Sequence, residues 1–180
     1  MLAQFSHFGR TQPVAAAAVA VCVIGVATVA GFLFFQHVLG YPPCPLCLEQ
    51  RIAYYVSIPL AVMILLGLTV GASRKVLVLA LVAIAAAMLW NSYLGIYHSG
   101  IEWQWWAGPQ DCSGPSNSFG PAGDLLKRLS EVRAVRCDEA PWRFLGLSLA
   151  GYNVLISLAL AAIALWGAAA AWKSRSVEAE

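Results

Sequence analysis

The chain of 180 residues is 60% hydrophobic and only 11% charged, with a formal net charge of +2 and a mean hydropathy of +0.71. A soluble domain carries about 25% charged residues, so this composition excludes an ordinary soluble protein, and the small net charge gives no indication of nucleic-acid binding. The charged residues gather in the tails, in two short connections and in one long loop. This distribution is typical of a membrane protein.

Four apolar runs predict membrane-spanning helices. They cover residues 14–39, about 52–70, about 76–97 and about 144–172, and none contains Asp, Glu, Lys or Arg. At ~1.5 Å per residue each run can cross ~30 Å of hydrocarbon. The alternative that the first run is a cleaved signal peptide would leave three spans, but the run is longer than a signal core. We therefore predict an all-α membrane protein, a single-domain four-helix transmembrane bundle.

Four spans place residues 40–51 and 98–143 on one side of the membrane, and both termini and the turn at 71–75 on the other. The four cysteines outside the spans, at positions 44, 47, 112 and 137, then face one compartment. The basic residues on the terminal side lie close to the spans, which favours cytoplasmic termini. Paired thiols persist as disulfides outside the cytosol. We therefore expect the cysteine-bearing loops in the periplasm.

The loop at 98–143 is too long for an ordinary linker, and such loops are usually functional. Its first part, from Ile101 to Trp106, is rich in tryptophan, which favours the membrane–water boundary. We expect Glu102 to be an exposed acid at this boundary, with proton transfer as the alternative role. Asp124 predicts the start of a short amphipathic helix that lies on the bilayer surface and brings Cys137 back toward Cys112.

The stretch YPPCPLCLEQR, residues 41–51, carries two cysteines, three prolines and an arginine. The prolines oppose a helix through Cys44, so the second helix should begin near Cys47. The helix dipole and Arg51, four residues later on the same face, both favour a thiolate at Cys47. We predict a reactive dithiol at the membrane surface. The arginine beside it could hydrogen-bond an acceptor such as the carbonyl of a lipid-soluble quinone.

Simpler interpretations remain for each of these residues. A lone C-x-x-C can be a zinc knuckle, but a four-cysteine site would need a second closely spaced pair, so we predict no metal. Arg51 could be an interface anchor that reaches the head groups. Cys22 lies inside the first span, where a thiol usually only packs. His37 and His98 lie at span ends, where a single histidine is most often structural.

Together these residues resemble the DsbB-type disulfide-bond formation family of the bacterial inner membrane. The resemblance is carried by Phe35-Gln-His-Val38, by Pro43-Cys-Pro-Leu-Cys47 followed by Arg51, and by the segment from Cys137 to Leu147. The four-span plan and the two cysteine pairs agree with it, so it covers nearly the whole chain. The segment from Tyr97 to Trp103 departs from the best-known members, which leaves the identity of the partner protein open.

The resemblance implies a protein-dithiol:quinone oxidoreductase. Cys112 and Cys137 would form a loop disulfide that oxidises a DsbA-like thioredoxin-fold protein in the periplasm, with Cys112 in the mixed disulfide. The electrons would pass to the Cys44–Cys47 disulfide, and Cys47 would reduce ubiquinone or menaquinone. Arg51 would hold the quinone, and His98 would lie near it.

Two other functions stay open on the sequence. A thiol oxidoreductase of the vitamin K epoxide reductase type also combines four helices with C-x-x-C, but there the motif lies near a last span, whereas here it follows the first. A non-enzymatic membrane scaffold would use its cysteines for structural bridges or for metal binding.

Overall fold

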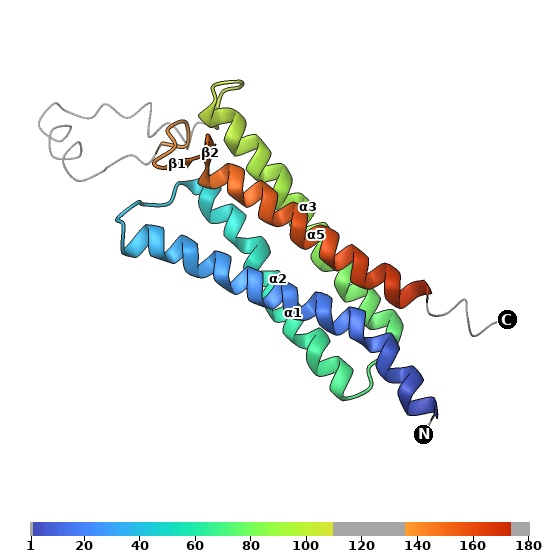
Figure 1. Cartoon of the computed structure of the whole chain (residues 1–180). Helices are drawn as coiled ribbons and strands as arrows, with labels where there is room; N and C mark the ends of the chain where they lie inside the picture. The colour runs from blue at the N-terminus through green and yellow to red at the C-terminus, as the bar shows by residue number, and fades with distance from the viewer. Residues whose placement is uncertain (1, 110–135, 174–180) are drawn as a thin grey trace, which may run out of the picture.

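The computed structural model describes residues 2–109 and 136–173. In chain order these residues form α1 (Leu2–His37), α2 (Pro45–Thr69), α3 (Arg74–Glu102), the strands β1 (Arg143–Phe144) and β2 (Leu147–Ser148), and α5 (Leu149–Lys173) (Figure 1). Within the described ranges, four helices are long and apolar enough to cross a membrane. Helices α1 and α3 each pack against both α2 and α5. The predicted fold class, an all-α four-helix transmembrane bundle, is confirmed.

Small residues at the contacts allow the helices to approach closely, as is common in membrane bundles. A Cβ added at Gly95 of α3 would lie 2.7 Å from Cγ2 of Val154 on α5. A Cβ added at Gly167 of α5 would lie 2.6 Å from the Cβ of Ala17 on α1. The buried core is also rich in alanine, including Ala17, Ala18, Ala61, Ala85, Ala161, Ala164, Ala168 and Ala171. The large apolar side chains instead lie mostly on the outer faces, where lipid would surround them.

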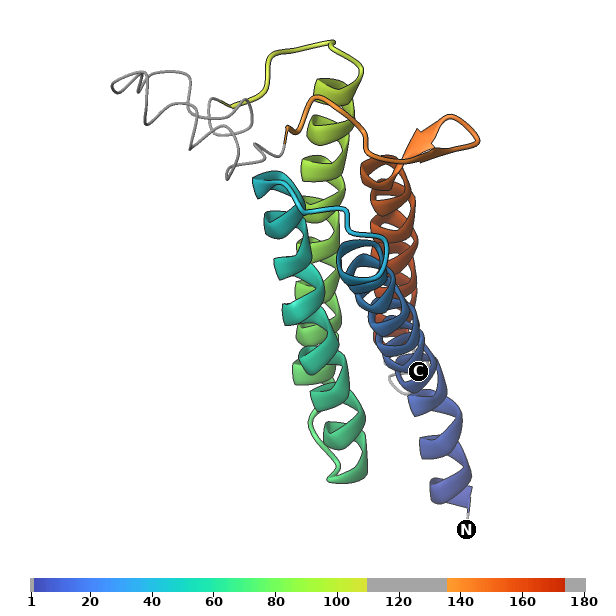
Figure 2. The same ribbon diagram turned by 90° about the vertical axis from the view of Figure 1, so that its left-hand side faces the viewer.

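The connections lie at two opposite ends of the bundle (Figure 2). The segment between α1 and α2 and the described parts of the segment between α3 and α5 lie at one end. The turn between α2 and α3 and the start of α1 lie at the other end. Cys44, Cys47 and Cys137 therefore share one end, as the counting of spans predicted. Cys112 and the helix predicted from Asp124 lie outside the described residues.

The helix ends differ from the predicted span limits in ways that matter for the site. Helix α2 begins at Pro45, with Cys44 as its N-cap, because the prolines exclude an earlier start. Helix α3 continues beyond residue 97 to Glu102, since no proline lies in residues 98–102 and the burial of most of these residues outweighs the low helix propensity of Gly100. His98 and Glu102 thus lie on a membrane helix rather than in the loop.

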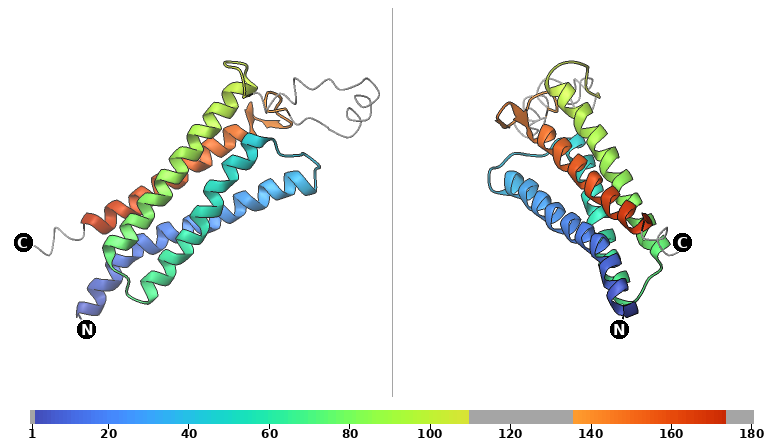
Figure 3. Two further views of the ribbon diagram at one scale, coloured as in Figure 1. Left: turned by 180° about the vertical axis from the view of Figure 1, so that it is seen from behind. Right: turned by 45° about the vertical axis from the view of Figure 1, so that its right-hand side comes forward.

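The last helix begins at Leu149 rather than at residue 144, because a short hairpin precedes it (Figure 3). Strands β1 and β2 pair antiparallel, with Phe144 opposite Leu147. The two turn residues, Leu145 and Gly146, have φ of 49° and 83°. Two positive φ values are typical of the tight turns whose twist matches a two-stranded hairpin. The hairpin directs the chain from the cysteine-bearing loop into α5.

Helix α1 diverges from the other helices toward the end that carries the cysteines (Figures 1 and 3). The chain between His37 and Pro45 has no helical structure and bridges the resulting separation. Phe32 and Phe35, near this end of α1, line a cleft together with Cys47 and Arg51 of α2.

Candidate functional site

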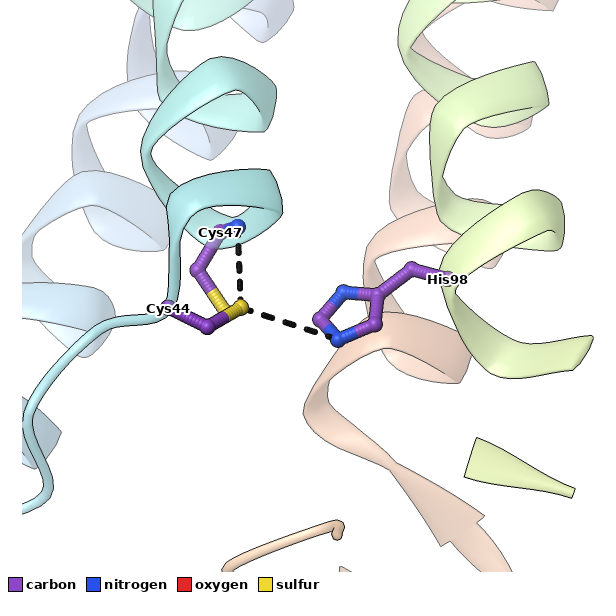
Figure 4. A group of neighbouring side chains, drawn as sticks. All are labelled: Cys44, Cys47 and His98. Carbon is purple, nitrogen blue, oxygen red and sulfur yellow. Dashed lines mark hydrogen bonds between the residues drawn. The ribbon is translucent and has the colours of Figure 1, made fainter. Parts of the chain in front are cut away.

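Cys44 and Cys47 form a close pair at the start of α2. Their sulfur atoms lie 2.7 Å apart, and the backbone N–H of Cys47 donates to the sulfur of Cys44 at 3.2 Å (Figure 4). Both are free thiols. A disulfide bond is ~2.05 Å long, so a small side-chain movement closes or opens it. The hydrogen bond with Cys47 and burial raise the pKa of the Cys44 thiol, so Cys44 keeps its proton in the reduced pair.

His98 reaches the same pair from α3. Its Nε2 lies 3.7 Å from the sulfur of Cys44 (Figure 4). Its Nδ1 lies 3.0 Å from the side-chain nitrogen of Gln50. The histidine is buried. The ligand atoms of Cys44, Cys47 and His98 all lie within 4.8 Å of one another, which is close enough for a single cation. Sequence analysis placed His98 near the quinone, and the structure places it directly beside the thiols.

Glu102 lies one helical turn after His98, and its Oε1 is 3.8 Å from the Nε2 of that histidine. Only 8% of Glu102 is exposed, so the expectation of an exposed boundary acid is wrong. The residue is buried because α3 continues to this point and because Arg143 donates to its backbone oxygen at 3.3 Å. Its Oε2 has no hydrogen-bond partner among the described residues. A carboxylate oxygen without a partner in the described part of the chain thus lies on the residue next to His98 in the site.

Arg51 lies one turn deeper than Cys47 on α2 and is held by α1. Its Nη1 donates to Oε1 of Gln36 at 2.7 Å, and its guanidinium carbon lies 5.7 Å from the ring centre of Phe32. These are a charge-assisted hydrogen bond and a cation–π contact. The side chain is 9% exposed, so it faces the interior rather than reaching outward to head groups. Sequence reasoning predicted the cation but not the Gln36 and Phe32 contacts that orient it.

A chain of buried polar side chains continues from His98 into the bundle. Asn153 of α5 donates to Oε1 of Gln50 at 2.6 Å, and the hydroxyl of Tyr54 donates to Oδ1 of Asn153 at 2.7 Å. Asn91 of α3 donates to Oγ of Ser157 at 2.9 Å. These contacts tie three helices together and orient the amide that contacts His98. Sequence reasoning missed this chain. The presence of amide side chains inside apolar spans was the available indication, because polar groups there usually find partners on neighbouring helices.

Two clefts meet at the thiol pair. The membrane-side cleft, of about 70 Å³, includes Phe32, Phe35 and Arg51 in its lining. The loop-side cleft, of about 340 Å³, includes Cys44, Glu102 and Arg136 instead. Several residues line both clefts: Tyr41, Pro42, Cys47, His98, Pro141, Leu149 and Ala150. The sulfur-bearing residue shared by both is Cys47, whereas Cys44 lines only the loop-side cleft.

Cys137 returns the loop to this site. It is disulfide-bonded and 1% exposed, and it packs in one buried cluster with Cys44, Leu46 and Ile101. Five residues on, Trp142 contacts the ring of Phe35 on α1 at 5.3 Å between ring centres. The structure therefore brings one cysteine of the loop onto the C-x-x-C pair. The predicted site residue Cys112 lies outside the described ranges.

Comparison with known proteins connects this arrangement to one family. The family model described as disulfide bond formation protein DsbB matches residues 14–167. The disulfide bond formation protein B of Albidiferax ferrireducens is 32% identical over 143 residues, which cover 71% of this chain and 75% of that protein. The protein of the same name from Xanthomonas oryzae pv. oryzae strain MAFF 311018 is 32% identical over 170 residues, or 85% of this chain and 90% of that protein. No solved structure matches this chain.

Proposed function

The chain belongs to the DsbB family of disulfide bond formation proteins, and we propose that it carries electrons from a periplasmic dithiol protein to a membrane quinone. As a family member with four spans it is a multi-pass membrane oxidoreductase of disulfide formation. In the proposed reaction, two thiols of the partner protein become a disulfide. The quinone takes up the two electrons and two protons and becomes a quinol. The partner we propose is a thioredoxin-fold protein like DsbA.

The observation that supports this proposal is that the two cysteines differ in which clefts they line. Cys47 lines both clefts, whereas Cys44 lines only the loop-side cleft and packs with Cys137. Arg51 lines only the membrane-side cleft. An oxidant from the lipid could therefore meet Cys47, while Cys137 of the loop could meet Cys44. This order supports an electron path from the loop pair through Cys44 to Cys47.

The individual steps follow thiol–disulfide exchange, in which a thiolate attacks a disulfide sulfur. A thiolate of the partner attacks Cys112 of the loop disulfide, and Cys137 leaves as a thiolate. The second partner thiol then displaces Cys112, which completes the partner's disulfide. Cys137 next attacks Cys44 of the Cys44–Cys47 disulfide, and Cys47 leaves as a thiolate. Attack of Cys112 on Cys137 releases Cys44 and restores the loop disulfide, so that both electrons now reside on Cys44 and Cys47.

Residues of the membrane-side cleft suit a quinone ring. Phe32 and Phe35 offer aromatic surfaces, and Arg51 offers hydrogen-bond donors to a quinone carbonyl. The cleft lies where α1 diverges from the bundle, so a ring carried by a lipid tail could enter from the bilayer. Both ubiquinone and menaquinone present such a carbonyl. In this proposal His98 borders the ring from the opposite helix.

The proposal also assigns the sides of the membrane. The cysteine-bearing end of the bundle would face the periplasm, and both termini would lie in the cytoplasm of a bacterial inner membrane. A periplasmic position would give the loop disulfide access to secreted proteins, whereas cytosolic thiols are kept reduced.

The test is a coupled assay with the purified full-length chain in detergent, a reduced thioredoxin-fold protein and a soluble quinone. We expect one quinone to be reduced per disulfide formed, as followed by quinone absorbance and thiol titration. Cys47→Ser should abolish the reaction, and Cys22→Ser, which changes a thiol packed near Ile58 outside the site, should keep it. Full quinone reduction by Cys47→Ser would refute the assignment, and a scaffold protein would consume no quinone at all.

A further inference from the structure

We propose that reduced Cys44 and Cys47, together with His98, form a binding site for a divalent cation of the Zn²⁺ class. The three residues come from the start of α2 and the end of α3, and their ligand atoms lie within 4.8 Å of one another (Figure 4). The spacing of cysteines alone did not predict a metal, because the third ligand lies 51 residues after Cys47 and only the fold brings it close. Binding of the cation does not depend on the quinone reaction proposed above.

The distances are near those of a tetrahedral zinc site. With Zn–S of ~2.3 Å and Zn–N of ~2.0–2.1 Å, a tetrahedron separates sulfur and nitrogen by about 3.6 Å and two sulfurs by about 3.8 Å. The sulfur of Cys44 already lies 3.7 Å from Nε2 of His98. The two sulfurs, 2.7 Å apart, must separate by about 1 Å, which side-chain rotation at Cys47 can supply.

In this proposal Glu102 supplies the fourth ligand after its side chain rotates, because its carboxylate lies outside the group of ligand atoms that fall within 4.8 Å of one another. Its Oε1 lies 3.8 Å from Nε2 of His98, and its Oε2 is buried with no hydrogen-bond partner among the described residues. A buried polar atom without a partner is costly, and coordination of a cation would remove that cost. Two thiolates, one imidazole and one carboxylate are a combination that suits zinc, whereas magnesium and calcium prefer oxygen ligands alone.

The neighbouring amide fits the role of a supporting residue. A zinc-bound histidine usually donates its other ring N–H to an oxygen acceptor. The side chain of Gln50 lies 3.0 Å from Nδ1 of His98. Rotation of the Gln50 amide by half a turn places its oxygen on Nδ1, so that the ring carries its proton there and leaves the Nε2 lone pair for the cation. Asn153, which donates to the same amide, must then rotate as well, and its contacts with Tyr54 and Asn91 must reverse their donors and acceptors.

Binding would make the site sensitive to both metal and redox state. Each cation displaces the two thiol protons and occupies a lone pair on both sulfurs. The bound pair then cannot close into a disulfide without releasing the cation, and the disulfide form offers no thiolate to bind one. The cation should therefore hold the pair reduced and inactive, and oxidation should release it.

The experiment measures zinc binding by the purified full-length chain in detergent. The Cys112→Ser/Cys137→Ser background removes the loop thiols from the measurement. The protein is reduced, stripped with a chelator and titrated with Zn²⁺ in competition with a chromogenic chelator. We expect one Zn²⁺ per reduced chain and no competitive binding after oxidation to the disulfide. Co²⁺ in place of Zn²⁺ should show thiolate charge-transfer absorption and the visible bands of a tetrahedral ion.

Variants separate this site from unspecific thiol binding. Loss of a supporting residue typically costs about 10–100-fold in metal affinity, so His98→Ala, which removes a ligand, should cost at least that much. Glu102→Gln should lower the affinity and shift the Co²⁺ bands. His37→Ala and Cys22→Ser are the matched controls and should bind as the parent does. Circular dichroism checks that each variant stays helical, and if His98→Ala unfolds, Glu102→Gln decides alone.

Unchanged zinc affinity in folded His98→Ala, or equal binding by the oxidised and reduced proteins, would overturn the proposal. A chain that binds zinc in this pattern but reduces no quinone would refute the proposed function and leave the metal site standing. A protein that reduces quinone, but binds no zinc in its dithiol form, would refute the metal site and leave the proposed function standing.

Discussion

Replacement of Arg51 by alanine tests the quinone-facing part of the site. The guanidinium lies in the membrane-side cleft, held by Gln36 at 2.7 Å and by the ring of Phe32 at 5.7 Å. We expect the variant to lose one charge-assisted hydrogen bond to the quinone carbonyl. Such a bond contributes about 1.5–3 kcal/mol, and each 1.36 kcal/mol is tenfold. The apparent KM for quinone should therefore rise by about 10- to 150-fold.

The assay follows quinone absorbance at varied quinone concentration with a fixed, saturating concentration of reduced partner. Arg51→Lys keeps the charge but loses the planar fork, so its KM should be intermediate. Gln36→Leu keeps Arg51 but removes the hydrogen bond that orients its guanidinium, so it should raise the KM for quinone by a smaller factor than Arg51→Ala does. Lys75→Ala, which removes a cation at the opposite end of the bundle, is the control. A change confined to the KM for the partner protein would refute the role given to Arg51.

Three further variants test other parts of the account. In Gly95→Val the added side chain meets Val154 and the carbonyl of Ala150, so we expect the free energy of unfolding to fall by about 1–3 kcal/mol, as measured by thermal unfolding. Gly31→Val, which has open space around the added side chain, should unfold at nearly the same temperature as the parent protein. An unchanged midpoint for Gly95→Val would contradict the close contact of α3 and α5. In Asn153→Leu the amide of Gln50 loses a partner, which should lower the free energy of unfolding by about 0.6–1.7 kcal/mol. We also expect quinone reduction to become slower. Quinone reduction at the wild-type rate would show that the buried polar chain does not position His98. Single cysteines introduced at Gly40 and Ser73 in a cysteine-free chain should react with an impermeant reagent from opposite sides of the membrane, and labelling of both from one side would contradict the four-span topology.

The four spans, and the position of the cysteine-bearing segments at one shared end, could be predicted because the bilayer imposes a fixed length on apolar runs. The start of α2 could be predicted to within two residues, near Cys47 against Pro45 in the structure, since prolines constrain the backbone locally. The end of α3 could not. Residues 98–102 include polar side chains that would suit a loop equally well, and only packing against the bundle decides that they stay helical and buried.

Sequence named several residues that the structure brings together in the candidate site, but not their contacts. Sequence placed Cys44, Cys47 and Arg51 around the start of the second helix, and the structure shows them there. It could not show that Glu102 is buried beside His98, or that Gln36 on α1 orients Arg51. These contacts join residues far apart in the chain, and a side chain's spacing within its own helix does not reveal its partner on another helix. The roles of the individual cysteines stay predictions.

The most direct test of the central claim is a single-turnover reaction between a soluble quinone and the reduced Cys112→Ser/Cys137→Ser protein, in which Cys44 and Cys47 are the thiols at the site. We predict that quinone absorbance falls by one equivalent per chain while two thiols disappear and a Cys44–Cys47 disulfide forms, as identified by mass spectrometry of the peptide. If the quinone is consumed with both thiols still free, or if the thiols stay reduced beside excess quinone in the absence of added metal, Cys44 and Cys47 do not deliver electrons to the membrane.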